Sequence, residues 1–186
     1  MDRIVRKMMR SCVKTTATVM SLTILVLYGI PHESRADFSI GVIAPLTGPR
    51  SDGGTYIKQA AETAEEDLAR SSGGMIRFIL EDSGYEPAKA VTAFKKLVEI
   101  DGVSLIVGPY GSSEVLAVAP LAERAKKIII APGAQSDEIS TAGDYVFRTI
   151  HNSAQEGPFF APHVAKRMNG VELAVLAIQT AFSPSY

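Results

Sequence analysis

Two adjacent serines follow a short apolar segment and come directly before a stretch with helical spacing. They are Ser112 and Ser113, within IVGPYGSSEV (106–115). The first turn of a helix has backbone N–H groups without partners and carries partial positive charge. Hydroxyl groups there, with Gly111 allowing close approach to the backbone, could bind a carboxylate or a phosphate. The alternative is that one serine only caps the helix, which contributes about 1 kcal/mol to stability.

A second loop of similar composition follows the next apolar segment, in the stretch APGAQSDEIS. Gly133 and Ala134 leave space beside the backbone, while Gln135 and Ser136 supply polar groups. This loop could therefore contribute to the same kind of site. The alternative is a plain connection from a strand to a turn, with Ser136 or Asp137 as its cap.

Sequence motifs for catalysis and nucleotide binding are missing. There is no G-x-S-x-G and no G-x-x-x-x-G-K-[ST], and no G-x-G-x-x-G follows the first apolar segment. His151 and His163 have no evident carboxylate or second histidine at metal-ligand spacing, which favours surface or capping roles. Glu81 and Asp82 could serve as a base or bind a metal, or could be a solvated strand end or part of a hinge network. We predict no catalytic residue, no metal site and no cofactor.

Apolar segments alternate with helical patterns from residue 38 onward. Buried strands are predicted over 38–46, 75–82, 103–108, 127–133, 144–150 and 171–178. Helices are predicted over 54–70, from Pro87 within 83–101, over 113–127 and over 154–168, the last two containing prolines. This alternation predicts right-handed βαβ crossovers and an α/β fold with a doubly wound parallel sheet.

The predicted fold determines where a ligand would bind. In an open parallel sheet the ligand crevice lies beyond the carboxyl ends of the strands. The loops at that edge are 45–55, 82–86, 108–113, 131–140 and 150–154. Both candidate loops are among them, and 45–55 could either close over a ligand or be an ordinary connection.

Composition excludes several classes of protein. The chain has 186 residues, of which 46% are hydrophobic and 21% charged, which is typical of a globular α/β protein and not of a disordered one. The net charge of −1 gives no indication of a nucleic-acid partner.

The first 36 residues have the layout of a secretory signal peptide. A basic stretch runs to Lys14, an uncharged and mostly apolar stretch follows over 15–30, and Ser34 and Ala36 are small residues before a cut at Asp37. The alternative is a transmembrane anchor, but the apolar stretch is shorter than the ~20 residues usually needed to span a bilayer. The single cysteine, Cys12, lies in this segment, so the remainder has no thiol, which fits a bacterial periplasm.

Five stretches, in this order, resemble the periplasmic branched-chain amino-acid-binding proteins of ABC importers. They are IGVIAPLTGP (40–49), LEDSGYEPAKAVTAFKKLV (80–98), IVGPYGSSEVLAVAP (106–120), IIAPGAQSDEIS (129–140) and GDYVFRT (143–149). The resemblance implies a type I periplasmic-binding fold, in which two α/β lobes joined by a hinge enclose the ligand. Together with the signal peptide predicted over 1–36, it implies an N-terminal ligand-binding lobe over 37–150 and the beginning of a second, truncated lobe over 151–186.

The same resemblance implies the roles of individual residues. The family's equivalents of Ser112 and Ser113 bind the ligand's α-carboxylate through hydroxyl and backbone N–H groups. The equivalent of Gly133 offers a carbonyl to the ammonium, Gln135 would add a side-chain contact, and Phe182 would pack on the ligand from the second lobe.

Three positions depart from the family pattern. Gln135 stands where a small Thr or Ser is common, Phe182 lacks the hydroxyl of the usual tyrosine, and Gly111 replaces a cysteine found in some members. The predicted ligand-binding set is Ser112, Ser113, Gly133, Ala134, Gln135 and Phe182. The departures leave the exact amino acid open, and aromatic acids or amides remain candidates.

These observations predict an exported solute-binding protein, present as an N-terminal fragment. It would bind amino acids, branched-chain ones foremost, or related small carboxylates, and would deliver them to the membrane permease of an ABC importer. We expect a periplasmic monomer that performs no chemistry. Three alternatives are an enzyme on a doubly wound fold, the ligand-binding sensor domain of a receptor, and a non-functional truncated product.

Overall fold

The computed structural model of the chain describes residues 38–71 and 76–168, together with the single positions 172, 174, 176, 180 and 181. The predicted signal peptide (1–36), Phe182 and most of the predicted strand 171–178 lie outside the described residues.

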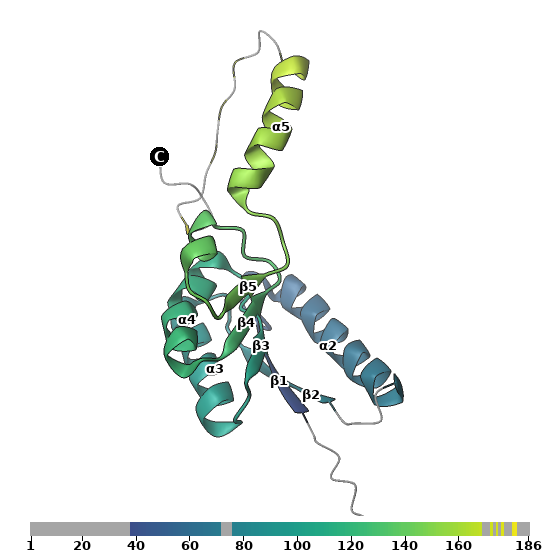
Figure 1. Cartoon of the computed structure of the whole chain (residues 1–186). Helices are drawn as coiled ribbons and strands as arrows, with labels where there is room; N and C mark the ends of the chain where they lie inside the picture. The colour runs from purple at the N-terminus through teal and green to yellow at the C-terminus, as the bar shows by residue number, and fades with distance from the viewer. Residues whose placement is uncertain are drawn as a thin grey trace, which may run out of the picture. The chain divides into compact units, whose positions relative to one another are not determined.

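The described strands form one parallel sheet of the predicted α/β type (Figure 1). The strands are β1 (Phe38–Ala44), β2 (Ile76–Asp82), β3 (Leu105–Val107), β4 (Ile128–Ala131) and β5 (Val146–Arg148). They pair in the order β2-β1-β3-β4-β5, and every pair is parallel. The chain thus winds outward in both directions from β1, so the direction of winding changes between β1 and β3. This confirms the doubly wound sheet and marks the place where such folds bind ligands.

The helices are α2 (Ser51–Ser71), α3 (Pro87–Lys95), α4 (Ser112–Ala125) and α5 (Ser153–Arg167). A π-helical turn (Lys96–Ile100) continues α3, and a 3-10 helix (Asp137–Thr141) lies between β4 and β5. Both α4 and α5 continue through their internal prolines.

The start of α2 differs from the prediction, because the helix begins at Ser51 and not at 54. The glycines that suggested a loop are inside the helix. Gly54 lies so close to the backbone of Pro45 that a side chain there would collide with it. The glycine therefore serves close packing of the helix on the preceding loop. As a result, the loop that could have closed over a ligand is shorter than expected.

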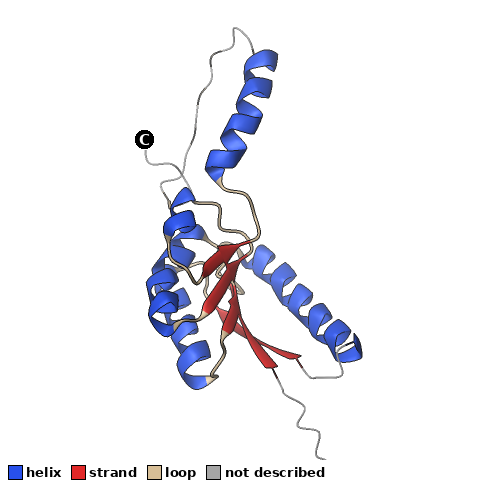
Figure 2. Ribbon diagram, viewed as in Figure 1, coloured by secondary structure: helices blue, strands red, loops and turns tan. Residues whose placement is uncertain are grey.

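Alternate residues of β1 face opposite layers, as a pleated strand requires. Val42 and Ala44 pack with Ala61 of α2, whereas Ile43 packs with Phe94 of α3 in the larger core cluster. The larger cluster also contains residues of α4, and Figure 2 shows α3 and α4 together on one face of the sheet and α2 on the other.

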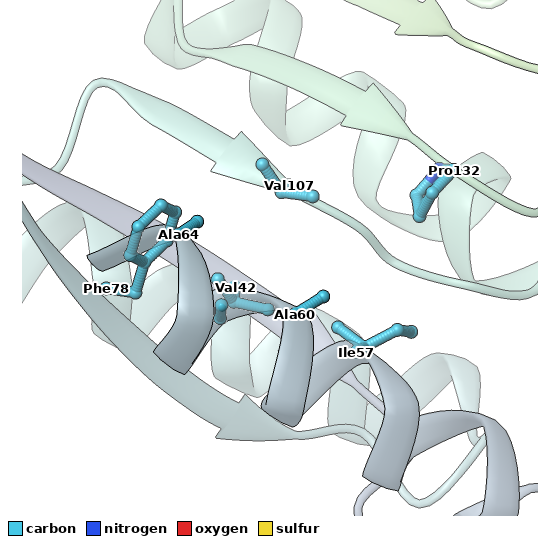
Figure 3. A pocket seen from close by; sticks show the side chains of 8 residues that line it. Val42, Ile57, Ala60, Ala64, Phe78, Val107 and Pro132 are labelled. Carbon is cyan, nitrogen blue, oxygen red and sulfur yellow. The ribbon is translucent and has the colours of Figure 1, made fainter. Parts of the chain in front are cut away.

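The face of the sheet beside α2 is incompletely covered. An apolar cavity of about 250 Å³ lies between α2 and the strands, and Figure 3 shows Ile57 and Ala60 of α2 opposite Val107 and Pro132. Beyond it, Ile128 of β4 and Phe147 of β5 remain 39% and 52% exposed. Parallel sheets are normally covered on both faces, so this apolar surface is unusual for the fold.

Candidate functional site

The two loops singled out in the sequence lie together at the carboxyl edge of the sheet. The Ser112 Oγ accepts a hydrogen bond from the backbone N–H of Ser136 at 3.2 Å, and both residues are only 5% exposed. The ring of Tyr110 also lies against Gly133, where an added Cβ would be 2.6 Å from the ring carbon Cε2. The loops after β3 and β4 are therefore in direct contact, as expected for neighbouring parallel strands.

The helix that follows β3 is not capped by a serine. Gly111 is the N-cap residue of α4, and no side chain of the N-cap accepts a helical N–H. The Ser112 hydroxyl instead bonds across to the next loop, so the capping alternative was wrong. A hydroxyl that accepts one hydrogen bond can still donate its hydrogen. Ser112 and the half-buried Ser113 thus place two hydroxyls in the first turn of α4, where backbone N–H groups favour an anion.

Glu114, in the same turn, has a buried carboxyl. Its side chain is 1% exposed, and its Oε2 accepts a hydrogen bond from the Gly111 N–H at 2.8 Å. Its Oε1 has no partner with hydrogen-bonding geometry among the described residues. Burial raises the pKa of the Glu114 carboxyl, and the nearby Ser83 hydroxyl and Gly111 N–H offset this only in part, while the charge of Asp82 raises the pKa further.

Two further predicted site residues, Ala134 and Gln135, lie on the loop after β4. Ala134 is fully buried among core residues that include Val115 and Ile139, so only its backbone could face a ligand. The Gln135 Nε2 lies 3.4 Å from His151 Nε2 and 3.4 Å from Glu156 Oε2. Its backbone carbonyl accepts a hydrogen bond from the Ser153 N–H. Gln135 is therefore tied to the N-terminus of α5.

His151 has a carboxylate partner that its sequence context did not suggest. Its Nε2 lies 3.4 Å from Glu156 Oε2, and both side chains are exposed. Among the described residues, no group of three His, Cys, Asp or Glu side chains could hold a metal ion.

Arg148, at the end of β5, was missed by sequence reasoning. Its Nη1 donates to the Ser136 carbonyl at 2.8 Å, and its Nη2 bonds the Ser140 hydroxyl. Nearby, Asp137 does not cap the 3-10 helix through its side chain but accepts the Ala154 N–H, at the start of α5, at 3.1 Å. The sequence feature that could have identified Arg148 is its position as a charged residue at the end of a short buried strand.

Glu81 and Asp82 have structural roles at the end of β2. Glu81 pairs with Lys96 Nζ at 2.6 Å. The Asp82 carboxylate accepts bonds from the Thr47 hydroxyl, the Thr47 N–H and the Gly84 N–H at 2.5, 3.1 and 2.8 Å. Burial raises the pKa of Asp82, but these hydrogen bonds lower it by more, so its pKa lies below the ordinary value. The loops after β1 and β2 are thereby joined.

The edge of the sheet thus combines hydroxyl and backbone donors with aromatic rings. Besides Tyr110, the Tyr85 ring packs on Gly111, and the Arg50 guanidinium lies 5.7 Å from the centre of the Tyr85 ring. Such groups can hold a small molecule with an anionic end and an apolar or flat body. The fold and this edge define the class: a doubly wound α/β lobe of a type that binds small ligands beyond the carboxyl ends of its strands.

Comparison with known proteins gives the family. Residues 37–186 match the family described as Periplasmic binding protein, and the chain belongs to it. A Leu/Ile/Val-binding protein homologue from Brucella melitensis is 30% identical over 161 residues, covering 84% of this chain and 43% of the relative.

No helix in the described part of the chain is both long enough and apolar enough to cross a membrane.

Solved structures of solute-binding proteins share the fold. A branched-chain amino acid transporter substrate-binding protein from Streptococcus pneumoniae, in complex with isoleucine, aligns with a TM-score of 0.67 at 25% identity, covering 72% of this chain and 39% of that one. A solute-binding protein of an ABC transporter from Rhodopseudomonas palustris, in complex with 3,4-dihydroxybenzoic acid, aligns with a TM-score of 0.65 at 29% identity, covering 70% and 36%. The chain therefore spans less than half the length of the relatives it matches.

Proposed function

We propose that this chain is part of an exported solute-binding protein of an ABC importer. It would bind amino acids, branched-chain ones foremost, or related small carboxylates, and hand them to a membrane permease without chemical change. The observation that carries this proposal is the buried Ser112 hydroxyl at the start of α4, bonded to the loop that contains Gly133 and Gln135. Family membership supports the same class of function.

The proposed organisation has a signal peptide over 1–36, the ligand-binding lobe over 37–150 and the beginning of a second lobe over 151–186. The exposure of α5 supports the last boundary. None of its residues is buried, and its aromatic residues Phe159 and Phe160 are exposed. Exposed aromatic side chains on a helix are typical of a surface that packs against another part of a protein, as a second lobe would.

The ligand class has two candidates, because the relatives are described with two kinds of ligand. One solved relative is described in complex with isoleucine and another with a dihydroxybenzoic acid. Both ligands have a carboxylate, which fits Ser112 and Ser113. The rings of Tyr110 and Tyr85 beside this turn also suit an aromatic ligand, because aromatic pairs attract one another beyond the effect of buried area.

Calorimetric titration of the full reading-frame product with leucine, valine, phenylalanine and benzoate tests the proposal. Saturable binding of an amino acid or of benzoate supports it, and binding of benzoate alone assigns the ligand to the aromatic acids. Ser112→Ala should weaken carboxylate binding by about 1.5–3 kcal/mol, the worth of a hydrogen bond to a charged group. Ser104→Ala is the matched control, because Ser104 is exposed and lies just before β3, at the opposite end of the strand. Equal affinity of the two variants would reject Ser112 as a ligand residue.

A further inference from the structure

Gly111 is held between two side chains from different parts of the sheet edge. An added Cβ would be 2.6 Å from Glu114 Oε2 and 2.7 Å from the Tyr85 ring carbon Cε2. Its N–H also donates to Glu114 Oε2 at 2.8 Å. The position of the Gly111 backbone, and with it the turn that presents Ser112 and Ser113, therefore depends directly on the Glu114 carboxyl.

The carboxyl that holds this turn is placed where a negative charge is unfavourable. A first-turn glutamate usually keeps its carboxylate in water, but that of Glu114 is 1% exposed and its Oε1 has no partner with hydrogen-bonding geometry among the described residues. The charged group whose field reaches it is Asp82, which is also negative. The remaining neighbours from the loop after β2 are the Ser83 hydroxyl and the Tyr85 ring, over which Arg50 lies.

A proton on Glu114 would remove the negative charge from a carboxyl that is buried. The protonated carboxyl keeps one oxygen to accept the Gly111 N–H and gains an O–H. The Ser83 hydroxyl, which lowers the pKa of Glu114 by donating to the ionised form, can also accept from this O–H. The Ser83 hydroxyl and the Gly111 N–H stabilise the ionised carboxylate, but they offset its burial only in part, and this carboxylate adds a second negative charge to the turn where a ligand carboxylate would bind. Like charges in one site disfavour each other's ionised forms.

We propose that Glu114 is a positioning residue of the ligand site, which fixes the turn 111–113 through the Gly111 N–H and binds a ligand carboxylate at Ser112 and Ser113 together with one proton. The inference rests on the proposed function, since it requires a carboxylate at this turn. Because binding and proton uptake are linked, ligand affinity falls as pH rises through the range in which Glu114 ionises, by at most about tenfold per pH unit for one proton.

The first test needs no ligand. The Gly111 amide signal is followed by NMR from about pH 4 to about pH 8 in the wild type and in Glu114→Gln. We expect a titration in the wild type with a midpoint above the ordinary glutamate pKa, and none in Glu114→Gln, which keeps the acceptor for Gly111 but has no charge. A wild-type signal that does not titrate, or one that titrates at the ordinary value or below it, would overturn the proposal.

The second test measures leucine binding, because neither charged group of leucine titrates between about pH 5 and about pH 7.5. We expect affinity to fall with rising pH in the wild type and to be flat in Glu114→Gln. Glu86→Gln is the matched control, because Glu86 is exposed, pairs with Lys89 and lies on the loop after β2; it should behave like the wild type.

Two outcomes separate the inference from the function on which it rests. If leucine binds with the same pH profile in the wild type and in Glu114→Gln, Glu114 is a structural cap only and the proposed function stands. If neither leucine nor benzoate binds saturably, the proposed function fails, and the link between a bound carboxylate and the proton fails with it. The role of Glu114 in holding the turn is then judged by the Gly111 titration alone.

Discussion

The hydroxyl oxygen of Ser112 and the backbone N–H of Ser136 are joined by a buried hydrogen bond of 3.2 Å. The two residues lie 24 positions apart in the sequence and on the loops after β3 and β4. This bond makes Ser112 important for stability as well as for the proposed ligand site, and the two roles can be separated.

Replacing Ser112 by alanine should lower the free energy of unfolding by about 1–3 kcal/mol, because it leaves the buried Ser136 N–H without its partner. Denaturant unfolding of the variant measures this. Ser113→Ala should leave stability within about 0.5 kcal/mol of the wild type but still weaken ligand binding, since no hydrogen bond within the described residues uses the Ser113 hydroxyl. Equal loss of stability in both variants would contradict the assignment.

Gly133→Ala should destabilise the protein by about 1–3 kcal/mol, because its Cβ would overlap the Tyr110 ring. Tyr110→Ala removes the ring, so the glycine substitution should cost much less in the double variant, which a double-mutant cycle by denaturant unfolding measures. Gly157→Ala is the control, since no atom lies within 4 Å of the added Cβ. Because Gly157 is inside α5, this substitution should raise the stability of that helix by about 0.5–1 kcal/mol.

The stability of the protein should depend on Glu114 in a defined direction with pH. Burial raises the pKa of this carboxyl in the folded state above its ordinary value of 4.5. The folded protein therefore holds this proton more tightly than the unfolded chain, so stability falls as pH rises from 4.5 through the folded-state pKa. Glu114→Gln should abolish this part of the slope and be the more stable protein at neutral pH. Chemical denaturation at a series of pH values gives the comparison, and an unchanged slope would be the contrary result.

The contribution of Asp82 to stability should depend on pH in the opposite direction to that of Glu114. Hydrogen bonds from Thr47 and Gly84 outweigh burial and lower its pKa below the ordinary value of 3.8. Its contribution to stability is therefore present above pH 3.8 and is lost as pH falls through the folded-state pKa. Asp82→Asn should cost about 1 kcal/mol at neutral pH, since the carboxylate is only partly buried, and nothing below the folded-state pKa. If Asp82→Asn still destabilised the protein in strong acid, the shape of the Asp82 side chain, and not its charge, would hold the loops after β1 and β2 together.

The sequence was sufficient to predict the sheet and its order of elements, because strands buried on both faces are continuous apolar segments separated by helices with 3.6-residue spacing. The predicted start of α2 was wrong because glycines usually interrupt helices, whereas Gly54 here allows the helix to pack closely on Pro45. The two candidate loops could be placed at one edge from topology alone.

Details of the site depend on tertiary contacts that no local pattern shows. The prediction that a serine caps α4 was wrong because the Ser112 hydroxyl accepts a hydrogen bond from the Ser136 N–H, 24 positions away in the sequence. The contact of Tyr110 with Gly133 likewise needs two loops to be in place first. Glu114 resembles an ordinary first-turn glutamate in sequence, and only its burial distinguishes it. The roles of Ser112, Ser113, Gly133, Ala134, Gln135 and Phe182 in ligand binding stay predictions.

Ser136 is bonded on both sides of its backbone, with its N–H to Ser112 and its carbonyl to Arg148. A loop fixed in this way has already lost its conformational entropy before any ligand arrives. A small molecule that fits this edge would not have to order the loop on binding, and preorganisation of this kind increases affinity mainly by removing that cost. The same rigidity means that the loop can hardly change its conformation to suit different ligands. Selectivity at this side of the site would therefore come from the fixed shape of the loop.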